Sequence, residues 1–180
     1  TAAPTITTYN AFAAGLVRDH ALRIGADPDA TLITGAGAWQ LMDGIVQTWP
    51  DEVESDLAPS TVVDRALAMA EALRTNLLTV DRAREGLLQL LVDLEEPRGG
   101  KAPARLREPA GKVRGRLALL ELVRAYERRK SELGLMEFSD QVALACAIAR
   151  SVPEVGEMLR SQYKVALIDE FQDTSVAQLG

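Results

Sequence analysis

The order of apolar and polar residues along the chain predicts a succession of helices. Apolar residues recur every three or four positions in several stretches, and this spacing places them on one face of an α-helix. The expected helices cover residues 10–24, 39–49, 60–77, 82–94, 113–133, 140–150 and about 151–162. The sequence therefore predicts a mainly α fold.

Residues that favour helix ends support several of these boundaries. Gly25 and Gly134 are plausible stops for the first and fifth helices, and Ser60 is a plausible N-cap for the third. Ser139 is expected to cap the helix over 140–150, and the string from Ser151 to Glu154 has a capping-box pattern. The stretch 97–112, PRGGKAPARLREPAGK, is predicted to be an irregular basic loop because of its prolines and glycines.

Two segments have the pattern of strands rather than helices. TITTY at 5–9 is rich in β-branched residues. Val165–Ile168 is a continuous apolar run, which is typical of a strand covered on both faces in a parallel sheet. A lone strand at each end of a helical chain is explained if both belong to one sheet whose other strands lie outside this sequence.

Acidic residues follow the second of these segments directly. Asp169 and Glu170 would stand at the carboxyl end of a strand, where open α/β sheets bind ligands. An aspartate there can hold Mg²⁺, and the adjacent glutamate can orient or deprotonate an attacking water. The alternative is that the two acids merely end a strand and begin a turn.

The full string around these acids is more specific. ALIDEFQDTS (166–175) closely resembles motif II, the Walker B element, of superfamily 1 helicases of the UvrD/Rep/PcrA and RecB type. TTYNAFA (7–13) is similar to motif Ib of that family, with Asn10 where histidine is commoner. GLMEFSDQVALA (134–145) is similar to the segment that precedes motif II, and departs from it at Glu137, Ser139 and Gln141. The middle of the chain carries no motif of the family.

The resemblance implies a domain organisation. Residues 1–25 and 135–180 would be pieces of the RecA-like motor domain 1A, and residues 26–134 would be the helical insertion called subdomain 1B. The expected fold is thus a helical 1B-type insertion with one or two short strands from a truncated α/β domain of a P-loop NTPase parent. On this interpretation the chain is a fragment of a longer protein.

The resemblance also implies roles for individual residues. Asp169 and Glu170 would hold Mg²⁺, Glu170 would activate water, and Gln172 would couple the nucleotide state to the DNA-binding elements. Thr8 and Asn10 would touch single-stranded DNA. ATP and Mg²⁺ are the cofactors expected of the parent. No phosphate loop of the form G-x-x-x-x-G-K-[ST] occurs in the 180 residues, so the chain alone is expected to hold neither cofactor and to be inactive.

Charge is distributed unevenly along the chain. The net charge is −6, yet the span 98–130 holds eleven of the twenty lysines and arginines and three acids, a local charge of +8. Polyanions respond to a local field more than to a total. Because this span would lie in subdomain 1B, Lys112, Arg114 and Arg116 are the predicted contacts to duplex phosphates, projecting together where the loop enters the helix. A solvated helix face is the alternative.

Composition excludes several kinds of chemistry. The chain is 47% hydrophobic and 26% charged, with one cysteine and one histidine, which argues against a disulfide, a cysteine-cluster metal site and a Ser-His-Asp triad. Cys146, among apolar neighbours, is expected to be a buried small hydrophobe. The sequence contains no apolar run long enough to cross a bilayer, so a cytoplasmic protein without a membrane partner is expected. Trp39 and Trp49 could stack on bases or pack in a core.

The leading hypothesis is part of an ATP-dependent DNA helicase of repair or recombination, acting on single-stranded and forked duplex DNA, with DNA-repair proteins as possible partners. One alternative is a duplex-DNA-binding or protein-docking module without catalysis. Others are the helicase component of a helicase–nuclease complex and, less well supported, a metal nuclease using Asp169 and Glu170. The exposed edge of a truncated sheet could also promote self-association.

Overall fold

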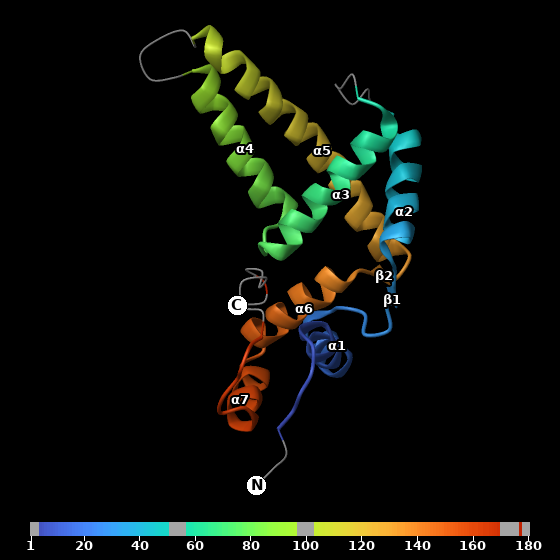
Figure 1. The fold of residues 1–180 in the computed structure, drawn as a ribbon, viewed down its shortest axis with the longest axis vertical. Helices are drawn as coiled ribbons and strands as arrows, with labels where there is room; N and C mark the ends of the chain where they lie inside the picture. Colours follow the sequence, from blue (N-terminus) through green and yellow to red (C-terminus); the bar gives the residue numbers. More distant parts are fainter. Residues whose placement is uncertain (1–3, 51–56, 97–102, 170–176, 178–180) are drawn as a thin grey trace. The chain divides into compact units, whose positions relative to one another are not determined.

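The computed structural model describes residues 4–50, 57–96, 103–169 and 177. These residues are mainly helical, as the sequence predicts (Figure 1). They form two compact units. The first unit comprises residues 1–32, 74–77 and 134–180, and the second unit comprises residues 33–73 and 78–133, both within the described ranges.

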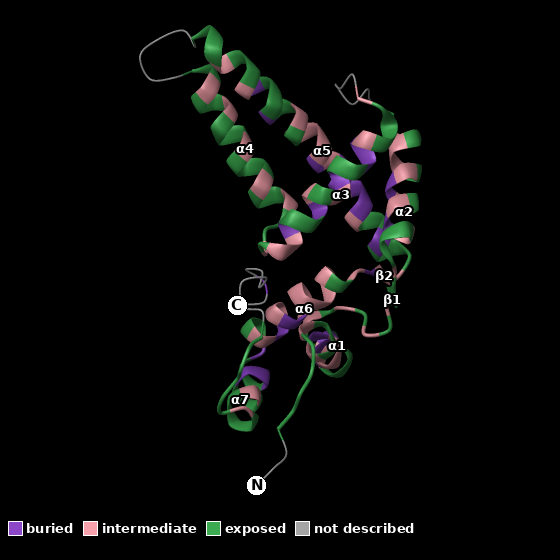
Figure 2. Ribbon diagram, in the orientation of Figure 1, coloured by how far each residue is buried: buried purple, intermediate pink, exposed green. Residues whose placement is uncertain are grey.

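The second unit is built from four helices. They are α2 (Gly35–Gln47), α3 (Pro59–Thr75, up to Leu73 in this unit), α4 (Val80–Glu95) and α5 (Arg107–Glu132), the last preceded by the 3₁₀ turn η2 (Ala104–Leu106). Their core contains the fully buried side chains Met42, Val63, Leu120, Val123 and Tyr126. Figure 2 shows the buried residues on α2, α3 and α5, whereas α4 carries none. Helix α4 packs along α5 as an antiparallel hairpin (Figure 1).

The first unit is organised around a helix pair. Helix α1 (Tyr9–His20), continued by the 3₁₀ turn η1 (Ala21–Ile24), packs against α6 (Phe138–Ser151), which is followed by α7 (Pro153–Gln162). Ala13, Val17, Ile148 and Val155 are among the residues buried between them. Two short strands, β1 (Thr31–Leu32) and β2 (Leu135–Met136), pair in parallel, with Thr31 opposite Leu135 and Leu32 opposite Met136.

Two glycines end elements where the backbone turns left-handed. Gly25 follows η1 with φ +73°, and Gly134 follows α5 with φ +61°. Glycine adopts this conformation without the steric cost that a Cβ brings. Both positions were predicted to terminate helices, and both do.

The predicted loop over 97–112 is wrong in its second half. Helix α5 begins at Arg107, six residues before the expected start at Val113. Pro109 does not prevent this, because it lies in the first turn of the helix, where backbone N–H groups have no intrahelical acceptor. Glu108 in the same turn is favoured by the helix dipole.

Two predicted N-caps lie inside the helices they were expected to open. Helix α3 begins at Pro59, so Ser60 is already a helical residue. Glu137, not Ser139, is the N-cap of α6, and the Asp140 carboxylate accepts a hydrogen bond from the Glu137 backbone nitrogen at 2.7 Å. Helix α6 therefore does have a side-chain N-cap, but Glu137 provides it, two residues before the predicted Ser139.

The capping box predicted for α7 is also wrong. Ser151 ends α6 instead of opening α7. Val152 is the N-cap of α7 and makes no side-chain cap hydrogen bond. The proline at the first helical position, Pro153, therefore sets this helix start.

The strands predicted at 5–9 and 165–168 do not form. Residues 5–8 have no regular structure, Tyr9 begins α1, and 164–168 have no regular structure either. A strand needs a neighbour for its backbone hydrogen bonds, and no described segment pairs with either one. As a result Val165 and Leu167 are 77% and 95% exposed. None of the described helices is long and apolar enough to cross a membrane.

Candidate functional site

The residues of the motif Ib-like segment lie at the start of α1. Thr8 is the N-cap of this helix, and its Oγ accepts a hydrogen bond from the backbone nitrogen of Ala11 at 3.2 Å. Asn10 lies in the first turn and is exposed. The N-terminus of a helix carries partial positive charge and free N–H groups, both of which favour an anion. Thr8 and Asn10 therefore lie at the end of the helix that favours an anion, and their contact with DNA stays a prediction.

An aromatic contact links α1 to the chain that leads toward the Walker B-like string. The rings of Phe12 and Tyr163 meet edge to face, with centroids 5.8 Å apart and planes at 74°. Such pairs contribute roughly 0.5–1.5 kcal/mol beyond the burial of their area. Because Tyr163 follows α7 directly, Phe12 fixes the point from which residues 164–169 leave the helical core.

The described part of the Walker B-like string ends at Asp169. This residue is exposed and follows the exposed apolar run 165–168. Glu170 and Gln172, the predicted catalytic residues, lie outside the described residues, as do 171, 173 and 174. A carboxylate is the type of oxygen ligand that Mg²⁺ prefers, and the metal role of Asp169 stays a prediction. Among the described residues no group of three or more His, Cys, Asp or Glu side chains could hold a metal ion.

The chain beyond this string returns to α6 at Ala177. Ala177 is buried, and its carbonyl oxygen accepts a hydrogen bond from Cys146 Sγ at 2.7 Å. Burial raises the pKa of the Cys146 thiol, and the nearby positive charge of Arg150 opposes the shift. Cys146 is thus a half-buried packing residue, less buried than the sequence predicted.

A buried ion cluster that the sequence did not reveal lies in the first unit. The Arg74 guanidinium contacts Glu137 Oε2 at 2.9 Å, Asp140 Oδ1 at 3.4 Å and Ser139 Oγ at 2.9 Å. The three charged side chains are only 10%, 17% and 16% exposed. Two of the acceptors, Glu137 and Ser139, stand where the sequence departs from the helicase pattern. The departure from the family pattern at Glu137 and Ser139 was the only sequence feature that could have indicated this cluster. The sequence around these residues gave no indication of Arg74, which is more than sixty residues away along the chain.

The three basic residues predicted to bind duplex DNA do not project together. Lys112 Nζ pairs with Glu108 Oε1 at 2.7 Å on α5, and Arg114 pairs with Glu95 on α4. Arg116 is exposed and makes no ion pair with the described residues. A residue two positions along a helix points about 200° away, so Lys112 and Arg116 share one side of α5 and Arg114 faces another. The hydrogen bond and charge of Lys112 lower the pKa of Glu108.

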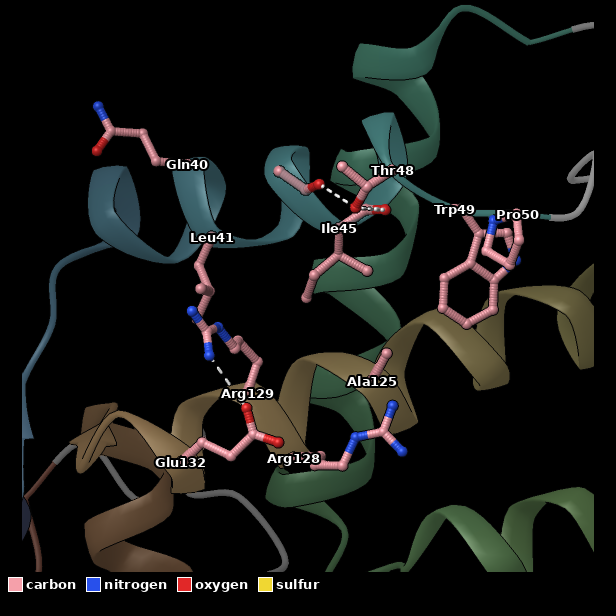
Figure 3. Close-up of a pocket in the computed structure, with 11 residues that line it drawn as sticks. Gln40, Leu41, Ile45, Thr48, Trp49, Pro50, Ala125, Arg128, Arg129 and Glu132 are labelled. Carbon is pink, nitrogen blue, oxygen red and sulfur yellow. Dashed lines mark hydrogen bonds and ion pairs between the residues drawn. The ribbon is translucent and has the colours of Figure 1, made fainter.

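The two tryptophans have different surroundings. Trp39 Nε1 donates a hydrogen bond to Asp64 Oδ1 at 3.0 Å, joining α2 to α3. Trp49, just after α2, packs partly on the core and also lines a cavity between α2 and α5 (Figure 3). Both tryptophans are thus partly buried against the same core, and Trp49 also borders the cavity.

The helical units, the Walker B-like string and the motif Ib-like helix start are features of one helicase class. The model of the UvrD/REP helicase N-terminal domain matches residues 1–180, the whole chain. The chain therefore belongs to the UvrD/REP helicase family.

Two kinds of relative are similar to parts of the chain. RecB, a component of the RecBCD enzyme of Mycobacterium tuberculosis (strain CDC 1551 / Oshkosh), is 34% identical over 116 residues, 64% of this chain and 9% of the relative. One component of the ATP-dependent helicase/nuclease of Lactococcus lactis subsp. cremoris (strain SK11) is 37% identical over 60 residues, 33% of this chain and 5% of the relative. The matched regions are thus less than a tenth of either relative.

Proposed function

We propose that the chain is part of an ATP-dependent DNA helicase that translocates on single-stranded DNA and unwinds duplex DNA in repair or recombination in the cytoplasm. In this proposal 26–134 form subdomain 1B, and 1–25 and 135–180 are pieces of motor domain 1A. One observation carries it: Val165–Ile168, an apolar run leading into Asp169, has no strand partner among the described residues and lies exposed, in a chain matched throughout by a helicase family model. A missing sheet accounts for that exposure.

Asp169 and Glu170 are assigned to the nucleotide site of the longer protein. Their carboxylates would hold the Mg²⁺ that accompanies ATP. Glu170 would take the proton of the attacking water, and Gln172 would relay the nucleotide state. The bound Mg²⁺ would neutralise part of the negative charge on the phosphates of ATP. The chain alone, which contains no phosphate loop, is proposed to hydrolyse no ATP.

DNA contacts are assigned to two places, one in each unit. Thr8 and Asn10 at the start of α1 would receive the phosphates of a single strand. Lys112, Arg114 and Arg116 on α5 would face duplex phosphates, with Arg116 the most available because it is unpaired among the described residues. Replacing Arg116 by Ala should lower the salt slope of duplex binding by about 0.9. An unchanged slope would remove Arg116 from the interface.

The decisive experiment uses the longer protein that contains these 180 residues together with a phosphate loop. Replacing Glu170 by Gln should reduce the kcat of DNA-stimulated ATP hydrolysis by about 10²–10⁴-fold, because the general base is lost, while ATP binding persists. Glu157→Gln is the matched control, since Glu157 is an exposed acid on α7. If E170Q kept full kcat, the assignment of the Walker B role would be wrong.

A second candidate is the helicase component of a helicase–nuclease complex. The names of the relatives, RecB of the RecBCD enzyme and part of a helicase/nuclease, favour it. Purification of the longer protein with its native partners would test this candidate. ATP-dependent exonuclease activity in the complex would support it, and helicase activity without any nuclease would oppose it.

A further inference from the structure

A cavity of about 600 Å³ lies between α2 and α5 in the second unit (Figure 3). This volume is within the range of sites that bind small ligands or single groups of larger ones, about 300–1,000 Å³. One wall comes from α2 and the residues just after it, and the other comes from the C-terminal part of α5. Leu41, Ile45 and Trp49 contribute apolar surface, and Arg128, Arg129 and Glu132 are the charged residues.

Among the described residues, the cavity presents one positive charge that has no ion-pair partner. Arg129 Nη1 pairs with Glu132 Oε2 at 3.1 Å. Arg128 is exposed and makes no ion pair with any described residue. Arg84 and Arg124, by contrast, contact Glu121. An anion entering the cavity would therefore meet Arg128 as its strongest attraction.

The cavity also presents a planar aromatic surface. Trp49 is its aromatic residue, and its indole N–H hydrogen-bonds to none of the described residues. Figure 3 shows the Trp49 ring and the Arg128 guanidinium at the same end of the cavity, one from the α2 side and one from α5. A flat ring and a cation that line the same cavity match a group that carries one planar moiety and one negative charge.

We propose that this cavity binds one nucleotide of single-stranded DNA, with the base stacked on Trp49 and its phosphate paired with Arg128. Stacking on an aromatic side chain tolerates any base, and an arginine beside it adds a charge-assisted contact. An acidic peptide fits less well, because its several carboxylates would meet only one unpaired cation. The inference rests on the proposed function, because it names a further contact to the single strand. It involves neither Asp169 nor α1, and its test requires no ATP hydrolysis, so the two proposals can fail separately.

The two tryptophans allow a direct measurement on this chain. Replacing Trp39 by Phe leaves Trp49 as the sole tryptophan, and titration with a short oligothymidylate should quench its fluorescence in a saturable way. Replacing Arg128 by Gln in that background should weaken binding about 10-fold or more and lower the single-strand salt slope by about 0.7. Arg65→Gln is the matched control: Arg65 is an exposed arginine on α3, outside the cavity and without an ion pair among the described residues. It should leave the affinity unchanged.

A second variant keeps the test valid if Trp39→Phe fails to fold, which circular dichroism would reveal. Trp49→Leu preserves apolar packing but removes the stacking surface. It should weaken binding of a labelled oligothymidylate by about 5- to 150-fold in fluorescence anisotropy. The difference between the original and Trp49→Leu emission then isolates the signal of Trp49.

Four results would overturn the proposal. One is a Trp49 fluorescence that does not respond to the strand. Another is equal weakening by R65Q and R128Q, which would indicate a diffuse charge effect. Saturation by thymidine monophosphate at the same concentration as the strand would assign the cavity to a free nucleotide. Tighter binding of an aspartate-rich peptide would assign it to a protein partner.

Discussion

At the residue scale, Arg74 joins three polar side chains near the start of α6. Its guanidinium lies against Glu137, Ser139 and Asp140 at 2.9–3.4 Å with little exposure to solvent. Glu137 and Asp140 also form the capping box of α6. The cluster therefore holds the N-terminus of the helix that leads toward the Walker B-like string.

Replacing Arg74 by Met should lower the free energy of unfolding by about 3–5 kcal/mol, because two nearly buried carboxylates lose the positive charge that lies against them. Urea denaturation would measure the change. Arg82→Met is the matched control, since the Arg82–Glu85 pair at 3.3 Å is 77% and 67% exposed, and such pairs contribute about 0–1 kcal/mol. An equal decrease in the free energy of unfolding in both variants would show that the Arg74 cluster stabilises the protein no more than an exposed ion pair does.

Cys146 gives a prediction about pH. Burial raises the pKa of its thiol, so the folded state favours the neutral form more than the unfolded state does. This contribution to stability is complete below the ordinary thiol pKa and is lost as the pH rises through the raised value. We expect slow alkylation that accelerates at alkaline pH, and a Cys146→Ala variant without the corresponding alkaline loss of stability. Alkylation as fast as in the urea-unfolded chain would contradict this.

At the element scale, glycines at helix ends and inside helices should respond in opposite ways to the same substitution. Gly134 has φ +61°, where an alanine is strained, and Gly86 lies inside α4 with nothing within 4 Å of an added Cβ. Gly134→Ala should destabilise by about 1–2 kcal/mol, whereas Gly86→Ala should stabilise by about 0.5–1 kcal/mol. Thermal unfolding of both variants checks the signs, and a shared sign would refute the backbone explanation.

At the scale of the whole molecule, the apolar run 165–168 is exposed in this chain, and we expect it to be buried in the longer protein that we propose. Leu167→Ser should change the stability of this chain by less than about 0.5 kcal/mol, because the side chain is 95% exposed. In the longer protein the same change should cost about 2–5 kcal/mol, because the strand would be buried. Leu22→Ser, at a residue 77% exposed on η1, serves as control in both. A similar small effect of Leu167→Ser in both proteins would argue against a completed sheet.

The sequence predicted the presence of the helices better than it predicted their ends. The predicted helices overlap every α-helix from α1 to α7. Most of them bury an apolar face that their own sequence defines, whereas the proline at its start indicated α7. The ends of helices were less accurate. Arg107 begins α5 within a stretch whose prolines and glycines predicted a loop, and Ser139 had the right chemistry for a cap that Glu137 supplies.

The sequence by itself determined the helical content and the family, because these depend on local periodicity and on contiguous strings such as DEFQD. The residues assigned to ATP and DNA stay predictions. Only the tertiary structure decided what depends on distant partners: Arg74 meeting Glu137, Arg114 turned toward Glu95, and Trp49 lining the same cavity as Arg128. The absence of strands at 5–9 and 165–168 has the same origin. A strand is stabilised by hydrogen bonds to another segment. A sequence pattern can therefore predict a strand even where no described segment pairs with it.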